Sequence, residues 1–230
     1  MGKQRAIITA ETFRFFRELG RNNHKSWMDE NRERYRGQVV EPLRRLLDAL
    51  TPAMRKLDSG FAVGGRSGEN FSRINRDIRF ANDKTPYRTQ MYLFFSRTAA
   101  PGRSGGQLYV GVSAETVTVG FRIYYASRES TLARVGIPRA TANGAWLERR
   151  RKRIARKYES YWYSSEKGTW TKHPGWPRDA KEWKKTKGWI VRRKFAPTAA
   201  TRAGFAGEVA RIFRELFPLF AFSSLPEWRP

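Results

Sequence analysis

The spacing of apolar residues predicts a helix close to the start of the chain. Phe13, Phe16 and Leu19 recur at three-residue spacing, which places them on one face of a helix. Thr9 is a suitable N-cap and Gly20 a suitable terminator. We therefore expect an amphipathic helix between these two residues.

A longer apolar stripe predicts a second helical run over about residues 26–50. Ser26 is a suitable N-cap, and Pro42 should kink or split the run because proline lacks the backbone N–H that a helix interior needs. The stripe consists of Trp27, Met28, Tyr35, Val39, Val40, Leu43, Leu46, Leu47 and Leu50. A Gly-rich polar stretch, residues 59–70, follows it as a loop.

The middle of the chain predicts β-strands. Residues 91–96, 108–113 and 116–125 are rich in β-branched and aromatic side chains. Only Ala114 and Glu115 separate the last two stretches, which is typical of a hairpin. An antiparallel meander of at least three strands is therefore expected.

Helical spacing returns in the second half of the chain. A short helix is expected near residues 130–135, and a longer one from Ala145, whose apolar face holds Leu147, Ile154, Tyr158 and Tyr161. A last amphipathic helix is expected over residues 203–217, with Pro218 ending it. The order of elements predicts an α+β fold in which helices from both ends pack on the antiparallel sheet, as a single domain over residues 1–230.

The charge of the chain points to a polyanionic partner. Lys and Arg number 46 against 21 Asp and Glu, which gives a net charge of +25, while 40% hydrophobic residues indicate a folded protein. Such a charge favours binding to nucleic acid or another polyanion. An anionic membrane is less favoured, because no exposed apolar face accompanies the basic run. A basic composition also serves solubility alone, and the oligomeric state stays open.

Several classes of protein lack support in the sequence. There is no cysteine, and the two histidines, His24 and His173, are few for a metal site and are each expected at a cap or turn. No phosphate-loop, dinucleotide-binding or nucleophile-elbow motif is present. We expect no metal and no cofactor. No signal peptide or stretch of transmembrane length is evident, so the expected location is cytoplasmic.

The most unusual segment is a charged run over residues 73–87. It reads R-x-x-R-D-x-R-F-x-x-x-D-K-x-x-Y, and periodicity alone does not decide between a strand and a helix. This pattern resembles the signature of a bacterial and fungal family known as domain of unknown function 2461. Asn22-Asn23 with Trp27, and residues 171–188, are similar to further parts of that family. The resemblance implies a shared fold and no particular activity.

The run suggests an anion site, and less strongly a catalytic one. Guanidinium groups offer paired donors to phosphate or carboxylate, so Arg73, Arg76, Arg79 and Lys84 are the candidate anion ligands. The candidate catalytic residues, for an enzyme acting on a phosphorylated or carboxylated substrate, are Asp77, Asp83, Lys84 and Tyr87. The alternative is a structural role, in which an Arg–Asp network pins an irregular loop, Asp83 caps a turn and Tyr87 lies partly in the core.

A second basic segment covers about residues 148–194. It holds 17 Lys and Arg against five acids, and five of the eight tryptophans of the chain. The candidate nucleic-acid surface is Arg149, Arg150, Arg151, Lys152, Arg153 and Arg156. Basic residues interleaved with aromatic ones are typical of single-stranded nucleic-acid binding. For each tryptophan, however, packing in the core is the favoured interpretation. We expect the segment to elaborate the domain.

Overall fold

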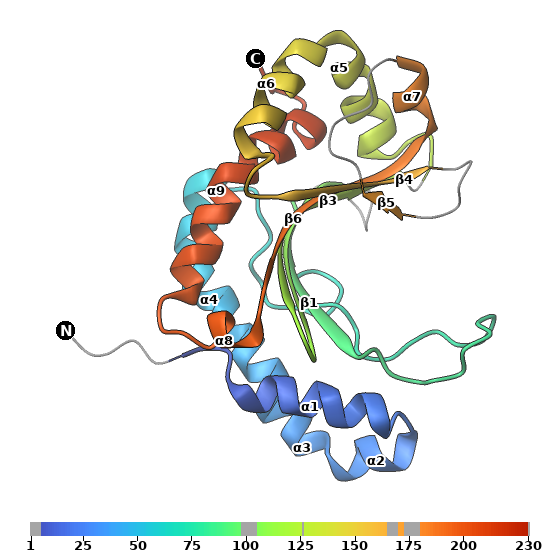
Figure 1. Ribbon diagram of the computed structural model, residues 1–230, viewed down its shortest axis with the longest axis vertical. Helices are drawn as coiled ribbons and strands as arrows, with labels where there is room; N and C mark the ends of the chain where they lie inside the picture. The colour runs from blue at the N-terminus through green and yellow to red at the C-terminus, as the bar shows by residue number, and fades with distance from the viewer. Residues whose placement is uncertain (1–5, 98–104, 126, 165–169, 173–179, 230) are drawn as a thin grey trace. The chain divides into compact units, whose positions relative to one another are not determined.

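The computed structural model describes residues 6–97, 105–125, 127–164, 170–172 and 180–229, and has the α+β architecture expected from the sequence. Its antiparallel sheet has six strands in the order β1-β2-β3-β6-β4-β5 (Figure 1). The strands are β1 (Gln90–Phe95), β2 (Gln107–Ser113), β3 (Val117–Tyr124), β4 (Glu159–Ser164), β5 (Trp170–Lys172) and β6 (Thr186–Phe195). The hairpin at Ala114 and Glu115 is confirmed, since the Ser113 N–H donates to the Thr116 carbonyl at 3.0 Å.

The chain divides into two compact units, and the expectation of a single domain stays a prediction. The first unit comprises residues 1–95, 110–118 and 194–211, and the second comprises residues 96–109, 119–193 and 212–230. Each unit contains one of the two cavities described below.

The first unit begins with the predicted helix, α1 (Ala10–Arg21), whose N-cap is Thr9; Gly20 does not end it, because the helix continues to Arg21 and its C-cap is Asn22. The next helix, α2 (Lys25–Glu30), differs from the prediction, because its cap is His24 and not Ser26. His24 Nδ1 accepts the Trp27 N–H at 3.3 Å, and the Ser26 hydroxyl lies 2.9 Å from the same nitrogen. Ser26 therefore supports the capping histidine.

At Pro42 the long helical run changes from a π-helical turn to an α-helix and is not interrupted, so the expected split does not occur. The run continues from α2 through α3 (Arg32–Tyr35) and a π-helical turn, η1 (Arg36–Val40), to α4 (Glu41–Leu57). Pro42 lies in the first turn of α4, directly after the π-helical turn in which the Glu41 N–H donates to the Arg36 carbonyl. The apolar faces of α1 and α4 form much of the core of this unit, including Phe13, Phe16, Leu19, Leu46 and Leu50.

In the second unit, one predicted helix is shorter than expected. The short helical segment near residue 130 consists of η3 (Leu132–Gly136) and α5 (Ile137–Ala142), and the longer one is α6 (Gly144–Ile154). Tyr158 lies beyond α6 and Tyr161 belongs to β4. Tyr161, Trp162 and Tyr163 are three consecutive aromatic residues, which suit a strand, and Tyr161 continued the helical spacing of α6 by coincidence.

The last helix, α9 (Phe205–Ser224), is longer than expected and passes through Pro218. The residues beyond the proline continue the apolar face, and Leu219, Phe220 and Phe222 are fully buried. The Arg139 guanidinium caps the end of α9, donating to the Phe222, Leu225 and Pro226 carbonyls at 3.0, 2.5 and 2.6 Å. Burial and this cap outweigh the hydrogen bond that Pro218 removes.

The basic segment contributes to the sheet itself and does not merely elaborate it. It contains β4, β5, α7 (Ala180–Lys185) and β6, and β4 pairs antiparallel with β6 in a register that places Trp162 opposite Trp189. The remaining helix, α8 (Pro197–Ala200), follows β6. In the part of the chain that the structure describes, no helix is long and apolar enough to cross a bilayer.

Candidate functional site

The signature run 73–87 forms an irregular loop and is neither a strand nor a helix. Its two arms run back along each other, with the Arg76 N–H donating to the Pro86 carbonyl and the Arg88 N–H to the Ile74 carbonyl, both at 2.8 Å. The loop precedes β1 and projects from the start of that strand (Figure 1). Phe80 lies at the turn and is 94% exposed.

The base of this loop is held by Asn23, from the corner between α1 and α2. The Asn23 side-chain amide donates to the Tyr87 carbonyl at 2.9 Å, and its oxygen accepts the Tyr87 N–H at 3.0 Å. The Tyr87 side chain is buried. Two segments singled out in the sequence are therefore joined, and Tyr87 has a packing role at the base of the loop.

Ion pairs within the loop occupy most of its charges. Arg76 Nη1 lies 2.5 Å from Asp83 Oδ2, and Asp83 also accepts the Thr85 N–H at 2.9 Å. The Thr85 N–H and the Arg76 guanidinium lower the pKa of Asp83 to about 2. Arg79 likewise pairs with Asp77 at 2.7 Å and lowers the pKa of that carboxyl. Carboxylates held in this way are weak bases at neutral pH.

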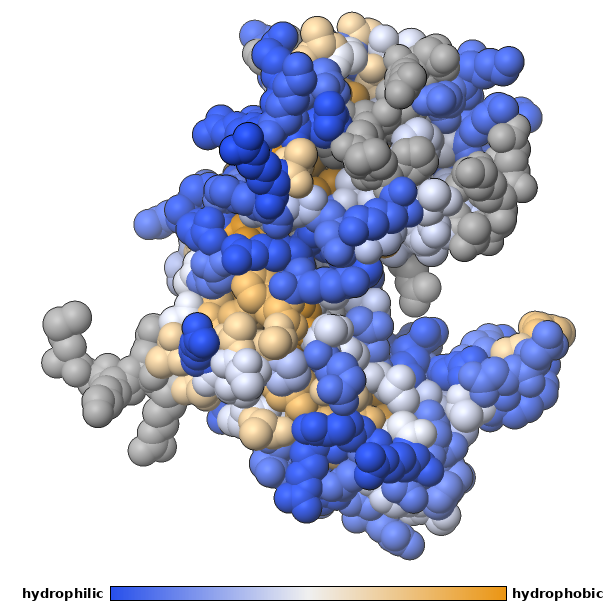
Figure 2. All heavy atoms as spheres, in the orientation of Figure 1, coloured by the Kyte–Doolittle hydropathy of each residue, from blue (hydrophilic) through white to orange (hydrophobic). Residues whose placement is uncertain are grey.

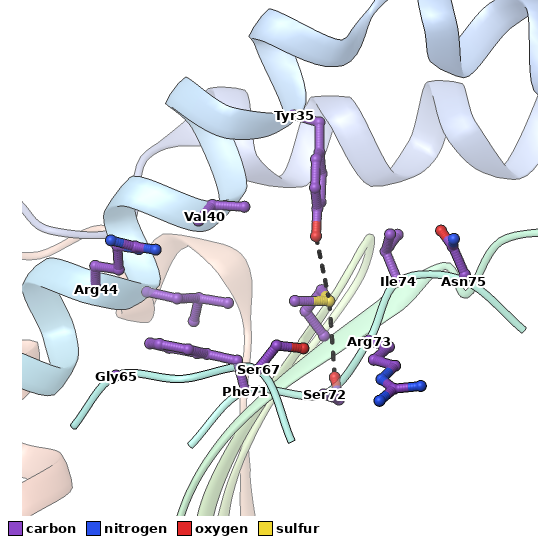
Figure 3. Close-up of a pocket in the computed structure, with 12 residues that line it drawn as sticks. Tyr35, Val40, Arg44, Gly65, Ser67, Phe71, Ser72, Arg73, Ile74 and Asn75 are labelled. Carbon is purple, nitrogen blue, oxygen red and sulfur yellow. Dashed lines mark hydrogen bonds between the residues drawn. The ribbon is translucent and has the colours of Figure 1, made fainter. Parts of the chain in front are cut away.

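The loop separates the other candidate residues. Lys84 donates to the Ile78 carbonyl at 3.1 Å and so closes the turn. Arg73, in contrast, lies at the base of the loop and lines a cavity of about 320 Å³ in the first unit. Asp77, Asp83, Lys84 and Tyr87 do not line this cavity, so the structure does not bring the candidate catalytic residues together with Arg73. The cavity is lined by Tyr35, Val40, Leu43, Arg44, Gly65, Ser67, Phe71, Ser72, Arg73, Ile74, Asn75 and Met91 (Figure 3).

The Gly-rich stretch 59–70 forms one wall of that cavity. Gly65 adopts a left-handed conformation, with φ of 70°, and its N–H donates to the Asn70 side chain at 2.9 Å. Asn70 is fully buried and donates to the Ala62 and Phe94 carbonyls at 2.8 and 3.1 Å. Its side chain therefore ties the stretch to β1 and fixes the cavity wall.

A second cavity, of about 260 Å³, lies between α6 and α9 in the second unit. It is lined by Arg150, Arg153, Ile154, Lys157, Arg214 and Glu215. Four cationic side chains thus converge on one concave site. We call these four residues the α6 cluster.

The acid in this cavity does not balance the α6 cluster. Glu215 accepts a hydrogen bond from the Tyr158 hydroxyl at 2.6 Å and lies 3.3 Å from Lys157 Nζ. Within the described residues, no carboxylate pairs with Arg150, Arg153 or Arg214. Burial and the charge of Arg153 lower the pKa of Arg150, so its charged form is less favoured here than in water.

The rest of the predicted nucleic-acid surface lies on the same helix or just beyond it. Arg149, Lys152 and Arg156 are exposed, and Arg151 pairs with Glu148 through Nε at 2.8 Å from Oε2. Figure 2 shows hydrophilic side chains gathered over this helix. Sequence reasoning missed Arg214, because it lies about sixty residues away on the outer face of α9, and nothing in the local pattern links it to α6.

The core interpretation is confirmed for two of the described tryptophans of the basic segment and is wrong for Trp170. Trp183 and Trp189 are buried and pack against each other with ring centroids 5.9 Å apart. Trp170 is 37% exposed and packs against the Tyr124 and Tyr163 rings. Trp176 and His173 lie outside the described residues.

The comparison with family models decides the relationship that the signature run suggested. The model described as a conserved hypothetical protein, DUF2461, matches residues 11–222. The chain belongs to the DUF2461 family. The DUF2461 match begins in α1 and ends in α9, so it includes both cavities and the signature loop. No curated protein matches the chain.

The described part of this DUF2461 protein offers no obvious place for a metal. No group of three or more His, Asp or Glu side chains that could hold an ion occurs among the described residues. Cationic or hydroxyl side chains line both cavities, and such groups suit the binding of anions.

Proposed function

We propose that this protein binds nucleic acid, or another phosphate-rich polyanion, through the α6 cluster in its second unit. The observation that carries the proposal is the convergence of Arg150, Arg153, Lys157 and Arg214 on one cavity. Like charges at such close range repel one another, and a bound phosphate relieves the repulsion.

The surroundings of the cavity support a polyanion more than a single small anion. Arg149, Lys152 and Arg156 extend the positive field along the exposed side of the helix and just beyond its end. A chain of phosphates can contact the cavity and this field together, and each neutralised phosphate releases condensed counterions. Binding of this type is mainly independent of sequence. The cytoplasmic location expected from the sequence stays a prediction that this function would suit.

The salt dependence of binding tests the proposal. The intact chain is titrated against a labelled oligonucleotide of about 20 nucleotides, single-stranded and duplex, over a series of salt concentrations. We expect a steep fall of log affinity with log salt on the duplex. The variant Arg153→Gln/Arg214→Gln should reduce the slope by about 2, because roughly 0.9 is lost per phosphate contact.

A matched control separates the cavity from net charge. Arg17→Gln/Arg45→Gln also removes two charges, from exposed positions on α1 and α4 that line neither cavity. The control should keep the wild-type slope. Absence of binding at low salt, or an equal loss in both double variants, would contradict the proposal.

The enzyme hypothesis stays a prediction and gains nothing from the geometry. A general base needs a pKa near neutrality, whereas hydrogen bonds to Thr85 and Arg76 lower the pKa of Asp83 to about 2. The paired loop instead has the features of the structural alternative, in which Asp83 caps a turn and Tyr87 is buried.

A further inference from the structure

The cavity of the first unit differs chemically from the α6 cluster, because most of its wall is apolar. Val40, Leu43 and Phe71 line one part, and Ile74 and Met91 line another. A volume of about 320 Å³ that combines apolar walls with polar groups is typical of sites for small organic molecules. The polar groups in the cavity therefore determine which polar group the bound molecule must carry.

Two hydroxyl groups in this cavity donate to a poor acceptor. The Tyr35 hydroxyl lies 3.8 Å from Met91 Sδ, and the Ser72 hydroxyl approaches the same sulfur at 3.7 Å (Figure 3). A thioether sulfur accepts hydrogen bonds only weakly. Both hydroxyls would gain if an anionic oxygen replaced the sulfur as their partner.

Both hydroxyls are also held as donors. Burial raises the pKa of Tyr35 to about 12, so its hydroxyl keeps its proton at neutral pH. Ser72 Oγ accepts the Tyr92 N–H at 2.9 Å, which directs the hydroxyl hydrogen away from that backbone group. The cavity thus presents two neutral donors that converge from opposite sides of Met91 (Figure 3).

Positive charge flanks these donors. Arg44 and Arg73 line the cavity on opposite sides and are exposed (Figure 3). No described carboxylate pairs with either guanidinium. The cations favour an anion, while the apolar walls disfavour one that is fully hydrated, such as inorganic phosphate.

We propose that this cavity binds a small organic carboxylate. Its carboxylate accepts hydrogen bonds from Tyr35 and Ser72, its apolar body packs on Leu43 and Phe71, and Arg73 of the signature loop supplies a compensating charge. This site goes beyond the polyanion surface of the second unit and does not depend on it.

The methyl resonance of Met91 reports directly on this site. The chain has four methionines, and Met28 and Met54 are fully buried away from the cavity lining. The intact protein is labelled with ¹³C at the methionine methyl groups and titrated with phenylacetate and with neutral phenylacetamide. We expect a saturable shift of the Met91 signal with phenylacetate, and binding of the amide weaker by about tenfold, because a carboxylate is the stronger acceptor.

Single substitutions assign the contacts. Tyr35→Phe, Ser72→Ala and Arg73→Gln should each weaken phenylacetate binding by about fivefold or more. Arg45→Gln, a neighbouring arginine on α4 that does not line the cavity, should bind like the wild type. Unchanged Met28 and Met54 signals show that a variant is folded. Only the variants that are folded are used to judge the proposal.

The lack of a saturable Met91 shift would overturn the inference. Equal affinity for the acid and the amide would do the same, as would equal affinity of the wild type and all folded cavity variants. Tighter binding of inorganic phosphate than of phenylacetate would also contradict it. The Arg153→Gln/Arg214→Gln variant should bind phenylacetate normally, so failure here is distinguishable from failure of the proposed polyanion function.

Discussion

The signature loop and the α6 cluster are both rich in arginine, but they differ in whether the arginines are paired with carboxylates. In the loop, Arg76 pairs with Asp83 and Arg79 pairs with Asp77. In the α6 cluster, no described carboxylate pairs with Arg153 or Arg214. The density of arginine therefore says little about binding. A guanidinium that is already paired with a carboxylate belongs to a structural network, whereas one without such a partner can bind an anion.

Charge reversal in the α6 cluster should produce the largest effect. Arg153→Glu/Arg214→Glu should lower oligonucleotide affinity at low salt by about a hundredfold, or about 2.7 kcal/mol, because attraction is replaced by repulsion. Both side chains are exposed, so stability should stay within about 0.5 kcal/mol. Fluorescence anisotropy and urea unfolding measure the two quantities. A large loss of stability without loss of affinity would show that these two arginines stabilise the fold and do not bind the oligonucleotide.

Loosening the loop should change stability and leave binding unchanged. Asn23→Ala removes both hydrogen bonds to the Tyr87 backbone and leaves partly buried groups without them. We expect the free energy of unfolding in urea to fall by about 2 kcal/mol. Oligonucleotide affinity under folding conditions should match the wild type, and a parallel loss of affinity would show that the loop takes part in binding.

Acid should weaken the loop through Asp83. Its pKa is depressed from an ordinary value of 3.8 to about 2, so the ionised form stabilises the folded state above pH 3.8, and this contribution disappears as the pH falls through about 2. The melting temperature of wild type should exceed that of Asp83→Asn at neutral pH. The difference should shrink between about pH 4 and pH 2. A difference that is constant with pH would rule out this linkage.

The smallest effect is expected at the tip of the loop. Phe80 is 94% exposed, so Phe80→Ser removes almost no buried surface and should change the free energy of unfolding by less than about 0.5 kcal/mol. Thermal unfolding measures this directly. A clear destabilisation would show that the ring packs in solution, and loss of oligonucleotide affinity would extend the binding surface to the loop.

The sequence predicts the elements well where one periodicity dominates. The α1 cap at Thr9 and the hairpin at Ala114 and Glu115 depend on neighbouring residues, and both are confirmed. The errors occur where distant contacts decide. The extension of α9 past Pro218 depends on buried residues beyond it and on Arg139, which lies about eighty residues away in the chain.

The same distinction applies to the sites. The basic residues of α6 could be predicted because they are contiguous in sequence. The cavity beside Met91 could not, because it combines side chains from the α3–α4 region, the Gly-rich stretch, the signature run and β1. The charge of the signature run drew attention to its carboxylates, whereas only Arg73 of its candidate residues reaches a cavity.

The projecting turn at Phe80 also makes the backbone accessible to enzymes. A protease that cleaves after aromatic residues should cut the Phe80–Ala81 bond first, because the ring is exposed and the turn has few packing contacts. The two fragments would stay associated, since the Asn23–Tyr87 and Arg76–Asp83 contacts and the Phe94–Asn70 backbone hydrogen bond all span the cut. We expect a nicked protein of this kind to elute as one species and to separate only in denaturant, which would show that the fold does not need the covalent continuity of the turn.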